Sequence, residues 1–191
     1  MRKLVYYVGV SLDGYIAGPA GEFDFFPVAD DVTAWIATDY PETIPAHLRP
    51  HLGMAVDTPN TRWDTLIMGR GTYEPGLAIG VASPYPHLKQ YVVSSTLPEA
   101  EDPAVEIVRE NPVALVRRLK AEEGRDIWLC GGGTLAGVLA DEIDELILKT
   151  YPVVAGTGVP VLAGAFRPTR FTPTARREFA SGAQVSWYTR A

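Results

Sequence analysis

Three consecutive glycines at residues 131–133 follow an apolar segment and precede a helix-like one, which makes them the first candidate for chemistry. Glycine loses more backbone entropy on folding than other residues, so we expect a run of three only where side chains would obstruct something. At a helix N-terminus, bare backbone N–H groups can approach an anion closely, and Thr134 can add a hydroxyl. The run therefore fits a pyrophosphate cradle, and it fits equally well a tight turn where helix and sheet touch. It matches neither the G-x-G-x-x-G fingerprint nor a P-loop, which would need a lysine.

Two other strand-like segments end in groups that suit phosphate. Residues 69–72 follow "DTLIM" and contain Arg70, whose guanidinium can bind a phosphate through two parallel hydrogen bonds. Residues 94–96 follow "QYVV" and carry three hydroxyls in a row. In open α/β sheets, ligands bind beyond the carboxyl ends of the strands, so the three groups should lie on one rim. This convergence predicts a dinucleotide with an extra phosphate, NADPH in particular.

Apolar strand-like runs alternate with helix-like segments along the chain. We expect strands near 3–12, 64–69, 90–96, 105–109, 126–130 and 145–154, and helices near 30–40, 112–124 and 134–142. The segment 170–190 alternates apolar and polar residues around Ser181-Gly182, as a hairpin does. The pattern predicts an α/β fold whose central, mostly parallel sheet is flanked by helices and ends in a C-terminal antiparallel hairpin. We expect one domain spanning residues 1–191.

Composition limits the classes of partner. The 191 residues are 47% hydrophobic and 21% charged, with a formal net charge of −6, as in ordinary globular proteins. An acidic surface argues against nucleic acid or an anionic membrane as the main partner. No segment reaches the roughly 20 apolar residues of a membrane helix, and a single cysteine, Cys130, can form no intrachain disulfide. We expect a cytoplasmic protein that acts on a small molecule.

Two polar groups have ordinary explanations. Asp30 and Asp31 open the helix predicted at 30–40, where either can cap the N-terminus. His47 and His51 stand four residues apart, as zinc ligands on a helix can, but Pro50 lies between them and no third ligand is near in the sequence. We predict no metal site.

Five sequence blocks occur in an order that resembles the dihydrofolate reductase superfamily. They are S-L-D-G-x-I-A at 11–17, I-M-G-R-x-T-Y-E at 67–74, V-V-S-S at 92–95, C-G-G-G-T-L at 130–135, and D-E-L-I-L with P-V-V-A-G-T-G-V-P-V-L within 144–162. The likeness is greatest to the branch that contains the reductase domain of the bifunctional riboflavin-biosynthesis deaminase-reductase. It covers nearly the whole chain apart from an insert at 41–62.

This resemblance implies NADPH as the hydride donor and assigns a role to each matching position. Arg70 and Thr72 would contact the cofactor's phosphates, and Ser94 and Ser95 the 2′-phosphate side. Gly9 and Ile16 would flank the nicotinamide, within reach of a mobile loop that includes residues 13–17. The cofactor-binding residues expected in full are Gly9, Ile16, Ala17, Gly69, Arg70, Thr72, Ser94, Ser95, Gly131, Gly132, Gly133, Thr134 and Leu135.

On the substrate side the resemblance implies a catalytic carboxylate on the first helix. Asp31 matches by position, with Asp30 beside it. Ala136 stands where folate reductases carry a tyrosine, and the insert has no counterpart in them. We therefore expect a pyrimidine- or pterin-like heterocycle, as in 5-amino-6-(5-phosphoribosylamino)uracil reductase. The alternatives are a dihydrofolate reductase proper, a nucleotide-binding module without turnover, and a flavin-using reductase.

The oligomeric state has one indication in the sequence. The C-terminal hairpin carries Val185, Trp187 and Tyr188, which could form a dimer edge. The riboflavin-type branch is consistent with a homodimer, so we expect one.

Overall fold

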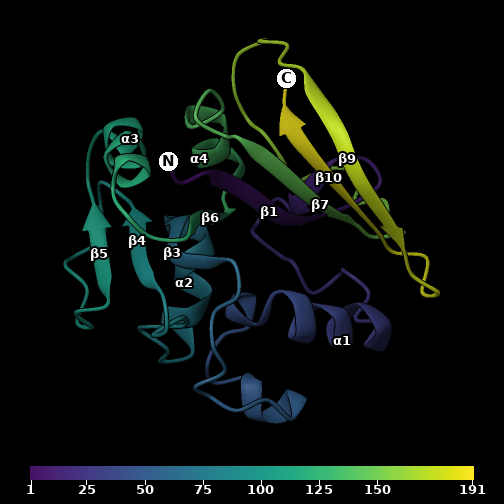
Figure 1. Cartoon of the computed structure of the whole chain (residues 1–191), viewed down its shortest axis with the longest axis horizontal. Coiled ribbons are helices and arrows are strands. Elements are labelled where there is room, and N and C mark those ends of the chain that lie inside the picture. The colour runs from purple at the N-terminus through teal and green to yellow at the C-terminus, as the bar shows by residue number, and fades with distance from the viewer.

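Eight strands form one continuous sheet in the computed structural model, which describes residues 1–191 (Figure 1). Their order across the sheet is β5-β4-β3-β6-β1-β7-β10-β9. The strands are β1 (Leu4–Val10), β3 (Trp63–Gly69), β4 (Lys89–Val93), β5 (Val105–Val108), β6 (Asp126–Gly131), β7 (Glu145–Thr150), β9 (Phe171–Glu178) and β10 (Gln184–Arg190).

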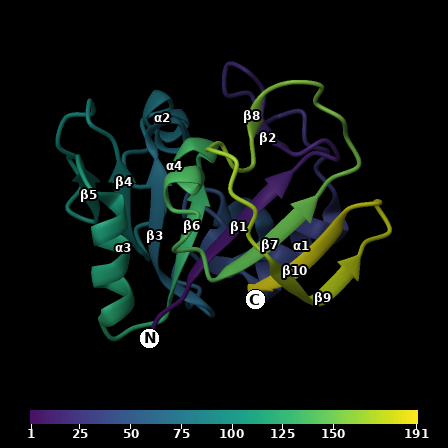
Figure 2. The same ribbon diagram turned by 90° about the horizontal axis from the view of Figure 1, so that it is seen from above.

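The first six strands of this order are parallel, and the last two are antiparallel to their neighbours. Strands β1 and β7 run side by side in the same direction (Figure 2). All six parallel strands therefore end at one edge of the sheet, where ligands bind in this architecture. The predicted α/β class, with its C-terminal antiparallel hairpin, is confirmed.

Helices cover both faces of the sheet. They are α1 (Asp30–Asp39), η1 (Pro41–Thr43), η2 (Arg49–Leu52), α2 (Arg70–Ala78), α3 (Pro112–Ala121) and α4 (Gly133–Val138). Trp35 of α1 and Tyr73 of α2 belong to one buried cluster, and Leu115 of α3 and Leu135 of α4 to a second. The two clusters lie on opposite faces, since α1 and α2 flank the sheet on one side and α3 and α4 on the other (Figure 1). Strand β1 is buried along nearly its whole length, as its apolar sequence predicts.

Of the two predicted helix caps, the one at the start of α3 is present and the one at the start of α1 is absent. The Asn111 side chain accepts a 3.0 Å hydrogen bond from the backbone N–H of Ala114, so α3 has the predicted cap, with Pro112 in its first turn. Helix α1 is preceded by Ala29, which makes no side-chain capping bond. The prediction that Asp30 or Asp31 caps α1 is wrong, because both lie inside the first turn. The Asp31 carboxylate accepts hydrogen bonds from the backbone N–H groups of Val32 and Ser181.

The insert at 41–62 folds around two fully buried charged side chains, Glu42 and Arg49. The Glu42 carboxylate accepts hydrogen bonds from the backbone N–H groups of Arg62 (2.6 Å) and Trp63 (2.9 Å). The Arg49 guanidinium donates to four main-chain carbonyls, those of Pro41, Ile44, Val56 and Thr58. Irregular backbone that is buried needs such partners, so these two residues give the insert a fixed shape.

The C-terminal hairpin turns its apolar side chains inward. Val185 is 1% exposed, and Nε1 of Trp187 donates a 2.9 Å hydrogen bond to the Tyr40 hydroxyl. Strand β9 is the free edge of the sheet, and its side chains are almost all exposed. Val185 and Trp187 therefore contribute to the core of this chain, and the homodimer stays a prediction.

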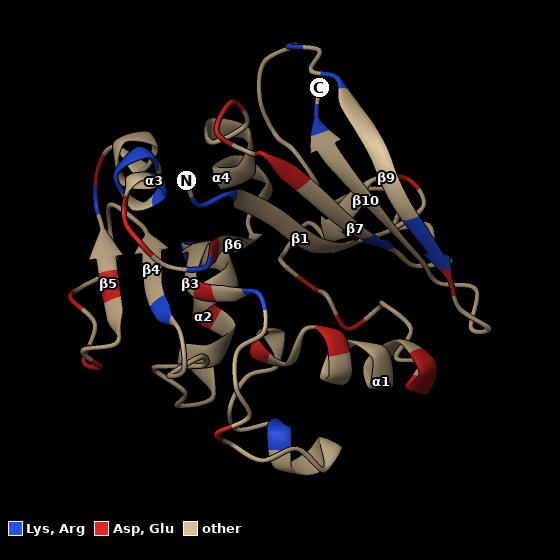
Figure 3. Cartoon of the chain, in the orientation of Figure 1, with Lys and Arg blue, Asp and Glu red and all other residues tan.

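The surface carries both signs of charge. Acidic residues lie at both ends of α1, and basic ones gather on α3 and at one end of β9 (Figure 3). None of the helices is long and apolar enough to cross a lipid bilayer.

Candidate cofactor-binding and active site

The turns that follow β3 and β6 touch each other. A Cβ built on Gly131 would lie 3.3 Å from Oγ1 of Thr72, and one built on Gly132 would lie 3.7 Å from Cα of Gly69. The two strands are neighbours in the sheet, which brings the glycine run beside the start of α2. Two of the three phosphate-compatible strand ends are thus in contact.

Arg70 connects the third strand end to these two. Its Nη1 donates a 3.0 Å hydrogen bond to Oγ1 of Thr96, and its Nε pairs with Glu74 at 2.6 Å. Ser95 is exposed, whereas the Ser94 hydroxyl is buried and accepts from the backbone N–H groups of Thr96 and Leu97. Ser94 therefore shapes the turn, and Ser95 and Arg70 are left facing solvent. We refer to these three adjoining turns as the phosphate ledge, which comprises Gly69, Arg70, Thr72, Ser94, Ser95, Thr96, Gly131 and Gly132.

The three glycines have different structural reasons. Gly132 has φ = +96°, a conformation that side chains disfavour. A Cβ on Gly133 would lie 2.0 Å from the carbonyl oxygen of Pro160, so the chain's own backbone excludes a side chain there. Leu135 is buried in the core, while Thr134 next to it is exposed. The turn interpretation thus accounts for Gly133, whereas at Gly131 an added Cβ would meet only the Thr72 side chain.

The groups on the phosphate ledge suit the phosphates of a dinucleotide. Gly69 precedes α2 without a side-chain cap, so N–H groups of the first turn are left for another acceptor. The side chain of Arg70 is about half exposed, at 53%. Helix N-termini and arginine both favour anions, and arginine matches a phosphate's geometry with two donors.

The loop after β1 is held in place by the carboxylate of Asp13. It accepts hydrogen bonds from the Ser11 hydroxyl (2.7 Å) and from the backbone N–H groups of Ala155 (2.9 Å) and Gly156 (2.7 Å). These bonds, the Ser11 bond foremost, lower the pKa of Asp13 to about 2. The loop also forms a small second sheet, in which β2 (Tyr15–Ala17) pairs with β8 (Val159–Pro160). Ile16 and Ala17 lie in this sheet, which the sequence analysis did not predict.

A cavity of about 340 Å³ opens beside the carboxyl end of β1. We call it the Lys149 cavity, and its lining residues are Tyr7, Val8, Gly9, Thr33, Ile36, Thr43, Ile44, Pro45, Leu48, Leu52, Tyr85, Trp128, Cys130 and Lys149. Cys130 lines it and the next residue, Gly131, belongs to the phosphate ledge, so the two features adjoin. The insert forms one wall of the cavity.

Lys149 is the one charged residue in the cavity lining, and the sequence analysis missed it. Its Nζ lies 3.8 Å from the centroid of the Tyr7 ring, and it makes no hydrogen bond or ion pair with the protein. Burial lowers the pKa of Lys149 to about 8, because the charged form loses hydration. Burial likewise raises the pKa of the neighbouring Cys130 thiol to about 12. A signal was present in the sequence: Lys149 stands two residues after the apolar Ile147, on the same inward face of a strand.

Asp30 and Asp31 do not line the Lys149 cavity. Asp30 is exposed, and Asp31 accepts hydrogen bonds from the backbone N–H groups of Val32 (2.8 Å) and Ser181 (3.0 Å). The Ser181 bond chiefly lowers the pKa of Asp31. The structure therefore places Asp31 as a link between α1 and the turn of the C-terminal hairpin, and its catalytic role stays a prediction.

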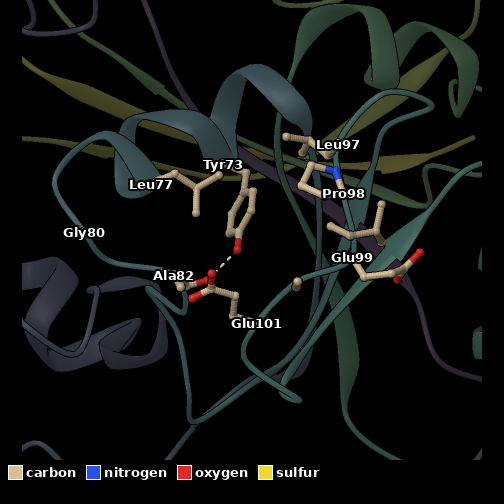
Figure 4. A pocket seen from close by; sticks show the side chains of 10 residues that line it. Tyr73, Leu77, Gly80, Ala82, Leu97, Pro98, Glu99 and Glu101 are labelled. Carbon is tan, nitrogen blue, oxygen red and sulfur yellow. Dashed lines mark hydrogen bonds between the residues drawn. The ribbon is translucent and has the colours of Figure 1, made fainter.

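A second cavity, of about 300 Å³, lies between α2 and the segment after β4 (Figure 4). The Tyr73 hydroxyl donates a 2.6 Å hydrogen bond to the carbonyl of Ala82 at its side. Its charged lining residues are Glu99 and Glu101, which would repel a phosphate. This cavity is therefore a poor site for a nucleotide's phosphates.

The histidines are accounted for without a metal. His47 and His51 are exposed, and Nε2 of His87 hydrogen-bonds the Glu42 carbonyl at 2.9 Å. No group of three His, Cys, Asp or Glu side chains is arranged to hold a metal ion.

The sheet order, the glycine turns on neighbouring strand ends and the cavity beside β1 define a dihydrofolate-reductase-like fold. A family model described as the RibD C-terminal domain matches residues 2–185, and the chain belongs to this family. The resemblance seen in the sequence is thereby confirmed. Two proteins of Bacillus subtilis (strain 168) are similar along nearly their whole length. YwjB is 30% identical over 97% of both chains, and YyaP is 26% identical over 95% of this chain and 91% of its own; both are named as uncharacterized.

Solved structures share the fold. A Shewanella sp. PV-4 protein named for riboflavin biosynthesis has a TM-score of 0.74 and 23% identity, with 100% of this chain and 99% of that one covered. A Thermotoga maritima diaminohydroxyphosphoribosylaminopyrimidine deaminase/5-amino-6-(5-phosphoribosylamino)uracil reductase has a TM-score of 0.64 and 14% identity. All of this chain, but only 57% of the Thermotoga chain, is covered.

Proposed function

We propose that the protein is an NADPH-dependent reductase that transfers a hydride to a pyrimidine- or pterin-like heterocycle, of the 5-amino-6-(5-phosphoribosylamino)uracil reductase type. The observation that carries the proposal is the phosphate ledge, in which three strand ends with phosphate-compatible groups meet next to a cavity. Membership of the RibD C-terminal domain family supports it. So does the likeness of fold to the Thermotoga protein, which is named for this reductase activity.

Each part of the ledge has a task in this proposal. Arg70 and Ser95 bind the 2′-phosphate, and the backbone at Gly131 and Gly132 receives the pyrophosphate. NADPH, when bound, supplies the hydride from its nicotinamide ring. Gly9 lines the Lys149 cavity, and the position of a Cβ built on it lies 3.1 Å from the Tyr151 ring, so the nicotinamide is assigned to the cavity side of β1 beside these two residues. The protein's contribution is to align the two rings and to exclude water between them.

The heterocycle is assigned to the Lys149 cavity. Its walls are mainly apolar, and Trp128 and Tyr85 present aromatic surface with ring centroids 5.3 Å apart at 83°. Such walls suit a flat ring, and small-molecule sites commonly combine apolar walls with a few polar groups. The insert adds Leu48 and Leu52 to the lining of the Lys149 cavity. Folate reductases have no counterpart of this insert and would lack these two side chains.

Hydride transfer can be tested directly. The protein is incubated with NADPH deuterated at C4 and, separately, with 5-amino-6-(5-phosphoribosylamino)uracil, a dihydropterin and dihydrofolate, and the products are analysed by mass spectrometry. The proposal expects deuterium in the product of the phosphoribosylated pyrimidine or of the pterin. Transfer to dihydrofolate alone would instead identify a dihydrofolate reductase.

A nucleotide-binding module without turnover is the second candidate. It is favoured by one observation, the absence of any carboxylate from the lining of the Lys149 cavity. It predicts that NADPH binds but that no compound in the panel acquires deuterium. An absorption spectrum of the purified protein separates both candidates from a flavin-using reductase, because bound flavin colours the protein yellow.

A further inference from the structure

Lys149 is a cation that faces a cavity without a partner of opposite charge. Lys149 is partly buried, and of the other three lysines only Lys120 is largely buried, where its Nζ pairs with Asp144 at 2.6 Å. Lys3 pairs with Glu145 at 2.5 Å, and Lys89 is exposed. Charges that lose part of their hydration are normally paired, because that loss is otherwise uncompensated. The unpaired ammonium of Lys149 is therefore a group that a ligand can satisfy.

The residues around Lys149 cannot supply the missing negative charge. The Cys130 thiol stays protonated at neutral pH, since burial raises its pKa to about 12. Burial also raises the pKa of Tyr7 and of Tyr85, so both remain neutral phenols. Lys149 itself, with a pKa of about 8, is mostly charged at neutral pH. The cavity thus presents one positive charge and no negative charge.

A second polar atom in the same wall lacks a partner. The Tyr7 hydroxyl is buried and makes no hydrogen bond within the protein. Tyr7 also carries the Lys149 ammonium over its ring, so both residues line the cavity at one place. An ammonium donates three hydrogen bonds and accepts none, whereas a phenol can donate one. Together they favour a ligand that offers oxygen acceptors.

We infer that Lys149 selects the substrate by the exocyclic groups on the substrate's ring. It accepts flat heterocycles that present carbonyl or deprotonated imide oxygens, and it rejects those that carry amino groups on a protonated amidine. The inference deepens the proposed function and rests on it for one point, that the Lys149 cavity is the substrate site. A protonated 2,4-diamino ring would place a second cation against the Lys149 ammonium, and two like charges in contact repel strongly in a poorly hydrated site. A 2,4-dioxo ring of the same shape would accept hydrogen bonds from it.

Two rings of equal shape test this selection. Quinazoline-2,4-dione and 2,4-diaminoquinazoline are titrated into the protein at neutral pH, and binding is followed by calorimetry and by tryptophan fluorescence. We expect the dione to bind at least about tenfold more tightly, as one charge-assisted hydrogen bond would provide. Lys149→Met should weaken the dione by about tenfold or more and remove the preference, and Lys149→Arg should keep part of it. Lys89→Met is the matched control, because Lys89 also lies over a tyrosine ring, that of Tyr91, but is exposed on β4.

The outcomes separate this inference from the reductase proposal. Equal or tighter binding of the diamino ring, no binding of the dione, or an unchanged dione affinity in a folded Lys149→Met variant overturns the inference. Thermal unfolding of both Lys149 variants establishes whether each is folded. If only Lys149→Arg is folded, the test uses the ring preference of that variant. NADPH binding is measured on the same samples. If NADPH binds and ring selectivity is absent, only the inference fails; if selectivity is present and NADPH does not bind, only the reductase proposal fails.

Discussion

Gly9 and Lys149 are register partners in the parallel ladder of β1 and β7. The residue expected beside the nicotinamide is thus paired with the only charged residue of the adjoining cavity. This pairing joins the two halves of the proposed site, because the phosphate ledge and the cavity then share one edge of the sheet.

Replacing Arg70 by alanine should weaken NADPH binding by about 10- to 100-fold, the effect of losing a charge-assisted hydrogen bond or two. NADH lacks the 2′-phosphate, so its affinity should change little. Calorimetric titration with both dinucleotides measures the difference. Arg118→Ala is the control, since Arg118 forms a similar exposed i,i+4 pair, with Glu122, on a different helix. An equal loss for NADPH and NADH would remove Arg70 from the recognition of the extra phosphate.

Two glycines of the run should respond differently to alanine. At Gly131 the added Cβ meets only the Thr72 side chain, at 3.3 Å. The free energy of unfolding of Gly131→Ala should therefore lie within about 1 kcal/mol of the native value, and the variant should bind NADPH more weakly. At Gly133 the Cβ meets backbone at 2.0 Å, so Gly133→Ala should lose about 2 kcal/mol or more. Chemical denaturation and NADPH titration of both variants check this. A Gly131→Ala variant with full NADPH affinity contradicts the assignment of the pyrophosphate to this turn.

Lys149→Met should stabilise the free protein at neutral pH. The pKa of Lys149 falls from its ordinary 10.5 to about 8 on folding, so the folded state binds fewer protons between these values. This lysine therefore destabilises the fold fully below pH 8, and the penalty disappears as the pH rises above 10.5. Removing it should contribute about 1–3 kcal/mol at pH 7, or roughly 2–8 °C in thermal midpoint. Midpoints of both proteins measured from about pH 6 to about pH 10 should draw closer toward the alkaline end, where most of the penalty is lost; a constant difference would assign the effect to packing.

Asp31→Asn separates the predicted catalytic role from a structural one. Because Asp31 accepts a hydrogen bond from Ser181 and lies outside the Lys149 cavity, we expect a slightly lower thermal midpoint and a hydride-transfer rate within a few-fold of native. Asp30→Asn, at an exposed position, serves as the control. A loss of transfer rate by two orders of magnitude or more, of the size general acid–base catalysis supplies, would instead support the carboxylate expected from the resemblance.

The insert should affect the ring and not the dinucleotide. Glu42→Gln replaces a buried carboxylate that accepts hydrogen bonds from Arg62 and Trp63, so we expect a loss of about 2–3 kcal/mol in stability. Since the insert carries Ile44, Leu48 and Leu52 into the Lys149 cavity, ring affinity should fall while NADPH affinity is retained. Loss of both affinities in a variant that is still folded would show that the two halves of the site are not separable.

The sequence allowed the sheet, the hairpin and the ledge to be predicted because each has a local signal. Short apolar runs mark β1, β3 and β6, and Asn111-Pro112 marks the start of α3. The order of blocks around Arg70 and Cys130 indicates the family. These signals depend on neighbours in the chain and survive without knowledge of tertiary contacts.

The fold of the insert and the place of Lys149 in the cavity could not be predicted, because both depend on distant partners. Glu42 and Arg49 look like surface residues, yet both are buried and hold the backbone of the insert. Lys149 stands in an apolar strand, where a lone lysine is easily assigned to solvent. The small sheet of β2 and β8 joins segments more than 140 positions apart, Tyr15 with Pro160, and two residues of β8 give no recognisable pattern.

The most direct test of the central claim is a crystal structure of the protein with NADP⁺ bound. The account predicts the 2′-phosphate at Arg70 and Ser95, the pyrophosphate against Gly131 and Gly132, and the nicotinamide beside Gly9 at the mouth of the Lys149 cavity. NADP⁺ bound away from these residues, or no bound NADP⁺ at saturating concentration, would contradict it.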